Sequence, residues 1–157
     1  MPGGASMSVR DYMTPDPVVV TPETTVAEIA RQLTRYRIGC VPVVDAAGDL
    51  VGLVTEADLF VRHSVVPFSS YRAPTLMGNW VDPDRIEQTY GDLGDKRASD
   101  VMTTALVTVD AGAPIGEAAR LMMQLERNHL PVVSSGRLVG ILTRHDLLRA
   151  LCRRLRT

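Results

Sequence analysis

Two short segments of the chain combine threonine and aspartate at a spacing that suits nucleotide recognition. Both follow the pattern Gly-x-x-Thr-x-x-Asp, and they pair Thr55 with Asp58 and Thr143 with Asp146. In each segment an apolar run ends at the threonine, so we expect a strand to end there and a helix to begin. Free N–H groups at a helix start favour an anion such as phosphate, and the threonine hydroxyl can add a donor. The carboxylate would repel phosphate, but it can accept two hydrogen bonds from a ribose diol.

The same spacing also has a purely structural interpretation. Thr-x-x-Asp at the start of a helix is a capping box, in which each of the two side chains accepts a hydrogen bond from the other residue's backbone. The occurrence of the pattern at two places does not choose between capping and binding, because a duplication copies caps as well as ligand sites. Both interpretations therefore stay open at this point.

The residues that follow the two threonines differ in charge. Thr55 is followed by Glu56, whereas Thr143 is followed by Arg144 and His145. A negative side chain beside a phosphate opposes binding, whereas a guanidinium can donate two hydrogen bonds to it. If both segments bind a nucleotide, we expect the second to bind a phosphorylated one more tightly.

An internal repeat places the two segments at matching positions in the chain. The sequence DYMT at residues 11–14 recurs as DVMT at residues 100–103, and the match extends through both Thr-x-x-Asp segments. Each copy carries a valine-rich run, an amphipathic run, two apolar runs around a glycine-containing turn and a final helical run. The predicted fold is α/β (α+β), with two β-α-β-β-α repeats related by a pseudo-twofold axis and two small sheets packed face to face.

Local signals define the first strand and the first helix of each copy. The strands are predicted at residues 18–20 and 107–109. The helix of the first copy begins at Thr25, which is spaced with Glu28 as a capping box, and Pro114 suits the first helical turn of the second copy. Both helices carry an apolar stripe. The stripes consist of Val26, Ile29, Ala30 and Leu33 in the first copy and Ile115, Ala118, Ala119 and Met122 in the second.

The chain between the copies has a different composition. It is rich in proline and carries Trp80, and Asp82-Pro83 predicts the start of a short helix that ends near Gly91. The predicted organisation is a flexible N-terminus at residues 1–8, a first repeat at 9–62, an insert at 63–97 and a second repeat at 98–157. A plain linker would not need a tryptophan, so we expect the insert to pack on the repeats or on a partner.

These motifs resemble a known family. The repeat, the PVV sequence of both hairpins, and the GLVTEAD and GILTRHD segments are similar to a tandem pair of cystathionine-beta-synthase (CBS) domains, a Bateman module. Members of that family commonly bind AMP, ADP, ATP or S-adenosylmethionine in two clefts between the halves. The resemblance implies that Thr55 and Thr143 contact phosphate or ribose, and that Asp58 and Asp146 hold the ribose hydroxyls.

The resemblance also implies an adenine pocket in each half, formed by the first strand and by the residues before the hairpin. The implied residues are Val18, Ile38 and Cys40 in one half and Val107, Arg127 and His129 in the other. Without the resemblance, the two valines and the isoleucine would be interpreted as core. Cys40 would be a small buried hydrophobic residue, and His129 a histidine whose hydrogen bonds are satisfied at an interface.

Several function classes are not expected from this sequence. A net charge of −1 argues against a general nucleic-acid binder. The arginines at residues 149–156 are explained by a helix C-terminus, with nucleic-acid binding as the alternative. The three histidines (residues 63, 129 and 145) and the two cysteines have no metal-ligand spacing, so no metal is predicted. No catalytic motif is present, and an enzyme is therefore not expected.

The sequence therefore predicts a regulatory module that senses an adenosine nucleotide and acts on an unknown partner protein in trans. The alternative is a nucleotide-free scaffold in which both Thr-x-x-Asp pairs only cap helices. Apolar residues at 121–125 and 150–155 exceed what one stripe needs, which favours a homodimer. No signal peptide or membrane-spanning run is recognised, so we expect a cytoplasmic protein without membrane contact.

Overall fold

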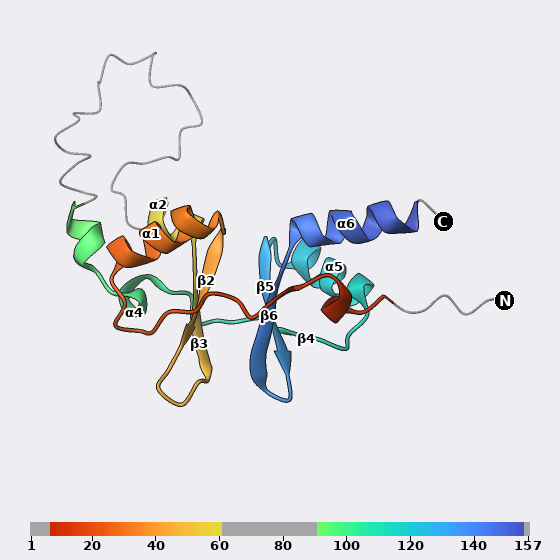
Figure 1. Cartoon of the computed structure of the whole chain (residues 1–157), viewed down its shortest axis with the longest axis horizontal. Coiled ribbons are helices and arrows are strands. Elements are labelled where there is room, and N and C mark those ends of the chain that lie inside the picture. Colours follow the sequence, from red (N-terminus) through yellow and green to blue (C-terminus); the bar gives the residue numbers. More distant parts are fainter. Residues whose placement is uncertain (1–6, 61–90, 156–157) are drawn as a thin grey trace, which may run out of the picture. The chain divides into compact units, whose positions relative to one another are not determined.

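The computed structural model describes residues 7–60 and 91–155, which form a mixed α+β fold and confirm the predicted class. The described chain falls into two compact units (Figure 1). One unit contains the chain up to Val18, the turn Ala46–Leu50 and the chain from Ala105 onward, and the other contains Val19–Asp45 and Val51–Thr104. No helix within residues 7–60 and 91–155 has the length and apolar character needed to cross a bilayer.

The unit that contains the first hairpin is built around one amphipathic helix. Helix α1 (Val26–Tyr36) is followed by strands β2 (Cys40–Val44) and β3 (Leu50–Thr55), which pair with each other, and by α2 (Glu56–Phe60). A further short helix, α4 (Ala98–Val101), contributes to the same core. The buried residues of α1 pack with those of the two strands; they are Val26, Ile29, Leu33, Val41, Val43 and Val54.

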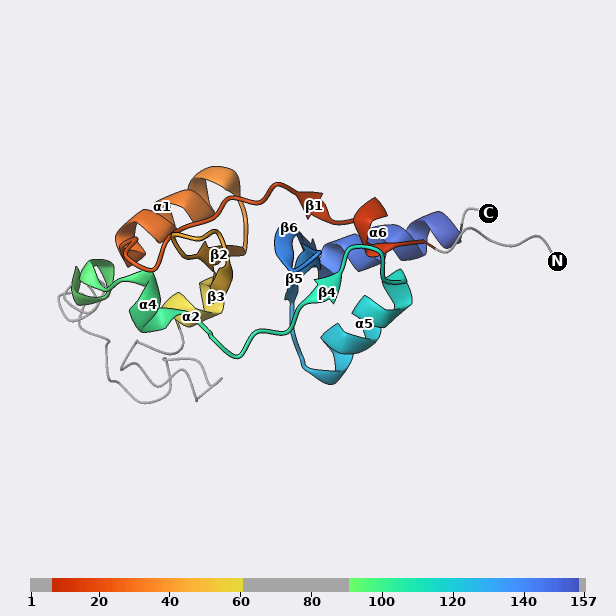
Figure 2. The same ribbon diagram turned by 90° about the horizontal axis from the view of Figure 1, so that it is seen from below.

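The unit that contains the second hairpin has a larger sheet. Its order is β1 (Thr14–Pro15), β6 (Arg137–Thr143), β5 (His129–Ser134) and β4 (Val109–Asp110), with only β4 and β5 parallel. The 3-10 helix η1 (Val9–Asp11) precedes β1. Helices α5 (Ile115–Gln124) and α6 (Arg144–Arg154) both lie on one side of the sheet (Figure 2). The predicted element order strand, helix, two strands, helix is thus confirmed in the second copy, and the helix, two strands and final helix are confirmed in the first.

The two units do not coincide with the two sequence repeats, because the opening segment of each repeat belongs to the other repeat's unit. Thr14, from the first DYMT segment, pairs with Ile141 of β6. Thr103, from the matching DVMT segment, forms an antiparallel bridge with Leu53 of β3. Each Thr-x-x-Asp strand is therefore flanked by a methionine-threonine segment from the other copy.

Some local predictions are corrected. Of the predicted strand 18–20, only Val20 forms a bridge, to Val43, and the second strand is Val109–Asp110 rather than 107–109. Ala30 is exposed and lies outside the apolar stripe, since only Val26, Ile29 and Leu33 of α1 are buried. Pro114 is the N-cap of α5 and not a residue of its first turn.

The other helix-end predictions have mixed outcomes. Thr25 caps α1 as predicted, since its Oγ1 accepts from the N–H of Glu28 at 3.3 Å. The Glu28 carboxylate, however, accepts from Arg31 and Gln32. The helix end predicted near Gly91 is wrong, because residues 91–95 are helical. Trp80 and the predicted helix start at Asp82-Pro83 lie outside the described residues.

The glycine of each Gly-x-x-Thr-x-x-Asp segment has a packing role. A Cβ atom on Gly52 would collide only with the Met102 side chain, whereas one on Gly140 would meet Met13 and also lie 2.9 Å from the Thr14 carbonyl oxygen. A methionine side chain can move, but the backbone oxygen of a paired strand cannot. Glycine is therefore required more strictly at position 140 than at position 52.

We predict that Gly140→Ala lowers the free energy of unfolding by about 1–3 kcal/mol, and that Gly52→Ala lowers it by less. Denaturant unfolding of the two variants measures the difference. The double variant Gly52→Ala, Met102→Ala is the control, because removal of the methionine relieves the overlap at position 52. Equal losses in the two single variants would contradict this assignment of the glycines.

Candidate functional site

The Thr143–Asp146 pair forms a closed capping box at the start of α6. The Asp146 Oδ2 atom accepts from the backbone N–H of Thr143 at 2.8 Å and from its hydroxyl at 2.8 Å. The Thr143 Oγ1 atom in turn accepts from the N–H of Asp146 at 3.3 Å. Only 4% of Asp146 is exposed, so the carboxylate is held in one orientation inside the fold.

The Thr55–Asp58 pair repeats this geometry at the start of α2. The corresponding distances are 2.9 Å and 3.0 Å to Asp58 Oδ2, and 3.4 Å from the Asp58 nitrogen to Thr55 Oγ1. Asp58 is 6% exposed. These two aspartates are the only charged residues among the buried ones of the described chain, and the same threonine contacts fix both.

The backbone at both helix starts is more occupied than the sequence suggested. The N–H of Glu56 donates to the Gly39 carbonyl at 3.0 Å, and the N–H of Arg144 donates to the Asn128 carbonyl at 3.2 Å. The N–H groups of Asp58 and Asp146 are bonded to their threonines. Two of the first three N–H groups of each helix are therefore already satisfied, and the anion attraction predicted from free N–H groups is reduced.

The second oxygen of Asp146 has a partner that sequence reasoning did not place in the site. Arg149 Nη1 donates to Asp146 Oδ1 at 3.1 Å. The spacing i, i+3 on one helix was the available signal, because residues three apart on a helix face each other. Asn128 was also missed, since its role depends on a carbonyl contact that no side-chain pattern reveals.

Some of the residues that the resemblance implies for the adenine pocket lie in the same unit as the second Thr-x-x-Asp segment. His129 is half-buried and lies directly opposite Thr143 in the register of β5 and β6. Arg127 is exposed two residues earlier, with its N–H bonded to the Met122 carbonyl at 3.0 Å. Val107 is partly buried against the core of the same unit, and Arg144 is exposed.

In the first half, the residues implied for the adenine pocket are partly buried or buried. Ile38 is partly buried and packs on the core around α1, and Cys40 is only 5% exposed. Val18 is half-buried and belongs to the unit that contains Thr143, not to the unit of Thr55.

The burial of Cys40 determines its chemistry. Burial is the main cause that raises the pKa of the thiol from 9.0 to about 12, and the negative charge of Glu56 adds to the shift. Because the folded-state pKa is raised, the resulting stability is fully present below about pH 9 and is lost as the pH rises toward 12. Cys152, on α6, is exposed.

We predict that one thiol of the folded protein reacts with a thiol reagent at pH 8 and that two react after denaturation. At this pH the buried Cys40 stays in the unreactive thiol form, because burial raises the pKa of its thiol to about 12, whereas Cys152 is exposed. Thiol titration with and without denaturant measures both counts. The control variant Cys152→Ser is expected to leave no rapidly reacting thiol, and a reactive Cys40 in that folded variant would contradict the assignment.

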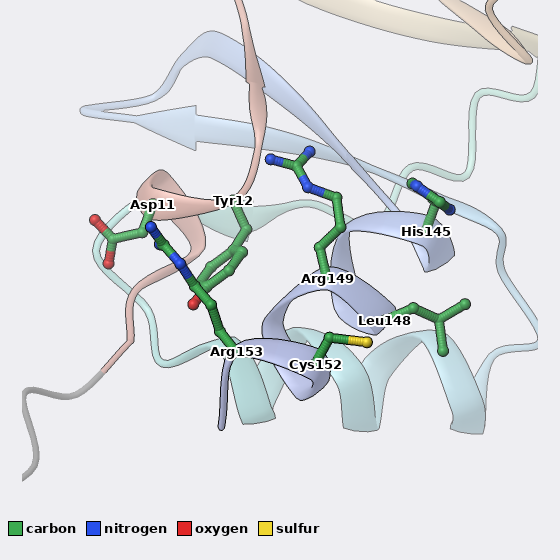
Figure 3. A pocket seen from close by; sticks show the side chains of 7 residues that line it. All are labelled: Asp11, Tyr12, His145, Leu148, Arg149, Cys152 and Arg153. Carbon is green, nitrogen blue, oxygen red and sulfur yellow. The ribbon is translucent and has the colours of Figure 1, made fainter. Parts of the chain in front are cut away.

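An open groove of about 490 Å³ lies beside α6. Figure 3 shows its side chains: Asp11 and Tyr12 from the N-terminal segment, and His145, Leu148, Arg149, Cys152 and Arg153 from α6. Arg153 lies over the Tyr12 ring at 5.9 Å. Within the described residues no group of three or more His, Cys, Asp or Glu side chains could hold a metal ion, and the metal-free site stays a prediction.

Comparison with known proteins identifies the two copies. The family model of the CBS domain matches residues 9–62 and 98–153. The chain is 32% identical over 155 residues to the CBS domain-containing protein CBSX1, chloroplastic, of Arabidopsis thaliana, covering 95% of this chain and 66% of that protein. It thus spans slightly less than two thirds of that relative.

Two solved structures share the fold. One is CBSX2 of Arabidopsis thaliana in complex with AMP, with a TM-score of 0.70 and 29% identity, covering 93% of this chain and 97% of that one. The other is the CBS domain of a CBS domain-containing membrane protein from Sphaerobacter thermophilus, with a TM-score of 0.71 and 35% identity, covering 92% of this chain and 87% of that one.

Proposed function

The chain belongs to the CBS-domain family, and from that premise we propose that it is a non-catalytic regulatory module that binds an adenosine nucleotide. The proposed ligand is AMP, ADP or ATP, with S-adenosylmethionine as a further member of the same class. The ribose hydroxyls would be recognised by Asp146 and Asp58, beside Thr143 and Thr55. The AMP complex of the related CBSX2 supports an adenosine ligand.

The observation that carries this proposal is the duplicated, pre-oriented buried carboxylate. A buried charge is costly unless hydrogen bonds compensate for it. The N-cap itself is the neutral threonine, and a neutral glutamine at the third helical position could complete the capping box without burying a charge. Both copies instead retain an aspartate that is at most 6% exposed. A carboxylate is the better acceptor for a ribose diol, which supports a role beyond capping.

Native mass spectrometry of the purified chain with AMP, ADP, ATP and S-adenosylmethionine tests the proposal. Bound nucleotide of unchanged mass is the expected result, and the stoichiometry reports whether one or both segments bind. A ligand that returns with altered mass would instead indicate an enzyme. If no ligand binds to the folded protein, the nucleotide-sensing function is overturned.

The alternative function is a nucleotide-free interaction scaffold, and the closed capping boxes favour it. Both threonine hydroxyls donate to their own aspartates, so neither is directed at a ligand in this structure. In that case the Thr-x-x-Asp pairs contribute only to stability. The same mass spectra distinguish the two functions, because a scaffold retains its oligomeric state and binds no nucleotide.

We further propose that the protein forms a homodimer, that it regulates a partner protein, and that it works in the cytoplasm. Apolar side chains on the outer faces of α5 and α6 support an interface: Met123 is 78% exposed, Leu148 58%, Leu151 52% and Leu155 77%. Patches of this kind on a soluble domain often mark contacts with other chains. Because the regulated partner would have to bind in trans, a second exposed surface is required for it.

We predict that Leu151→Glu converts a homodimer to a monomer at micromolar concentration. Leu151 is half exposed on α6, so a glutamate there leaves the core intact but places a charge in the proposed interface. Light scattering gives the mass, and unfolding temperature shows that the variant is folded. Val19→Glu, a change at a 42% exposed side chain of the other unit, is the matched control. A monomeric parent protein would contradict the proposal.

A further inference from the structure

From the contacts of Asp146, we infer that Arg149 is a positioning residue that keeps the second ribose-binding carboxylate closed until a ligand replaces it. This inference rests on the proposed function and concerns the regulation of the same site. The ribose hydroxyls and the Arg149 guanidinium would compete for the same acceptor oxygen, Asp146 Oδ1.

The hydrogen bonds of Asp146 leave only one oxygen for a ligand. Oδ2 already accepts from the N–H and from the hydroxyl of Thr143, both at 2.8 Å. Oδ1 accepts from Arg149 at 3.1 Å. The Asp146 side chain is 5% exposed, so a diol has little access to it while the guanidinium stays in place.

Arg149 is the partner that can leave. Its side chain is 59% exposed, and it lines the open groove beside α6 (Figure 3). An ion pair with one exposed member contributes little to stability, and long side chains lose entropy when they are held. Thr143, in contrast, is fixed by its place at the end of β6. Movement of Arg149 into the groove would therefore open Oδ1 without disturbing the helix cap.

The sequence restricts this arrangement to the second repeat. The residue three positions after Asp146 is Arg149, whereas the residue three positions after Asp58 is Val61, which carries no charge. An i, i+3 ion pair of the same kind is therefore not available to Asp58. The competition with an arginine three positions along the helix would therefore act at the second Thr-x-x-Asp segment.

The test compares AMP with 2′,3′-dideoxyadenosine monophosphate, which lacks the diol. Binding of both is measured by calorimetry for the full chain, for Arg149→Met and for Arg153→Met. Methionine retains much of the length of arginine but cannot donate to Oδ1. Arg153 is the matched control, because it lies one turn further along α6, lines the same groove and carries the same charge. All three proteins carry Asp58→Asn, so that diol recognition is confined to the second repeat.

Arg149→Met is expected to strengthen AMP binding roughly two- to fivefold, the range that corresponds to one exposed ion pair. It should leave the dideoxy nucleotide unchanged, and Arg153→Met should not change the preference for AMP over the dideoxy compound. Weaker AMP binding in Arg149→Met, or an equal change for both nucleotides, would overturn the inference while the sensor function stands. If the parent protein is folded and binds no AMP, the proposed function fails, and the inference that rests on it fails as well.

Discussion

Asp146→Ala is expected to remove most of the thermal stabilisation that AMP gives to the protein, and Asp58→Ala is expected to remove much less. At about 100 times its dissociation constant a ligand stabilises the fold by about 2.7 kcal/mol. For a chain of 157 residues this corresponds to a rise in melting temperature of about 5–10 °C. Thermal unfolding of the parent and of both variants, with and without AMP, measures the effect.

The difference between the two variants follows from charges near the two helix starts. Arg144 follows Thr143, whereas Glu56 follows Thr55, and both side chains are exposed. A charge-assisted hydrogen bond from a guanidinium to phosphate contributes about 1.5–3 kcal/mol. The Arg149–Asp146 pair opposes ligand binding by at most about 1 kcal/mol. The second segment is therefore expected to remain the tighter one.

Controls separate ligand recognition from capping. Loss of the aspartate's half of the capping box costs about 1 kcal/mol of stability in the absence of nucleotide, and both alanine variants should show this loss. Asp146→Asn is the better-matched variant, because an asparagine oxygen can still accept from Thr143 but the negative charge is gone. Equal loss of the AMP response in the Asp58 and Asp146 variants would contradict the asymmetry. No AMP response in any protein would indicate that the pairs are caps only.

The secondary structure could be predicted because its signals are local. Helix α1 begins at the predicted cap Thr25, and Val26, Ile29 and Leu33 are buried as their spacing indicates. The exchange of opening segments could not be predicted. The DYMT and DVMT segments are nearly identical, and nothing in their pattern indicates which hairpin each of them joins. That choice depends on contacts such as Met13 with Gly140, which are distant in sequence.

The candidate site was predictable in its residues and in its capping hydrogen bonds, which the capping-box interpretation describes, but not in the backbone contacts around them. The Thr-x-x-Asp spacing gave both aspartates, and burial of these residues requires the partners that the structure shows. The sequence could not reveal that the carbonyls of Gly39 and Asn128 occupy N–H groups at the helix starts. These carbonyls come from the chain before the hairpin, and their position depends on the whole repeat. The helix starts thus offer fewer free N–H groups than the sequence predicts.

Met122→Ala is expected to destabilise the fold by about 2–5 kcal/mol, whereas Met123→Ala is expected to change its stability by less than about 0.5 kcal/mol. The two residues are neighbours on α5 and chemically identical, but Met122 is 1% exposed and Met123 is 78% exposed. Removal of Met122 leaves a cavity among Leu130, Leu142 and Ala118, which belong to the same core. Denaturant unfolding at low protein concentration measures both variants.

The same pair also distinguishes a core role from an interface role for α5. Met123 lies on the outer face proposed for the homodimer, so its replacement should weaken dimerisation in light scattering although the monomer keeps its stability. Met122 faces the core, and its replacement should lower the free energy of unfolding whatever the oligomeric state. If Met123→Ala destabilised the monomer as much as Met122→Ala does, the orientation of α5 would be wrong. Because one helical step separates the two residues, a rotation of α5 by about 100° would bring Met123 to the buried position that Met122 occupies.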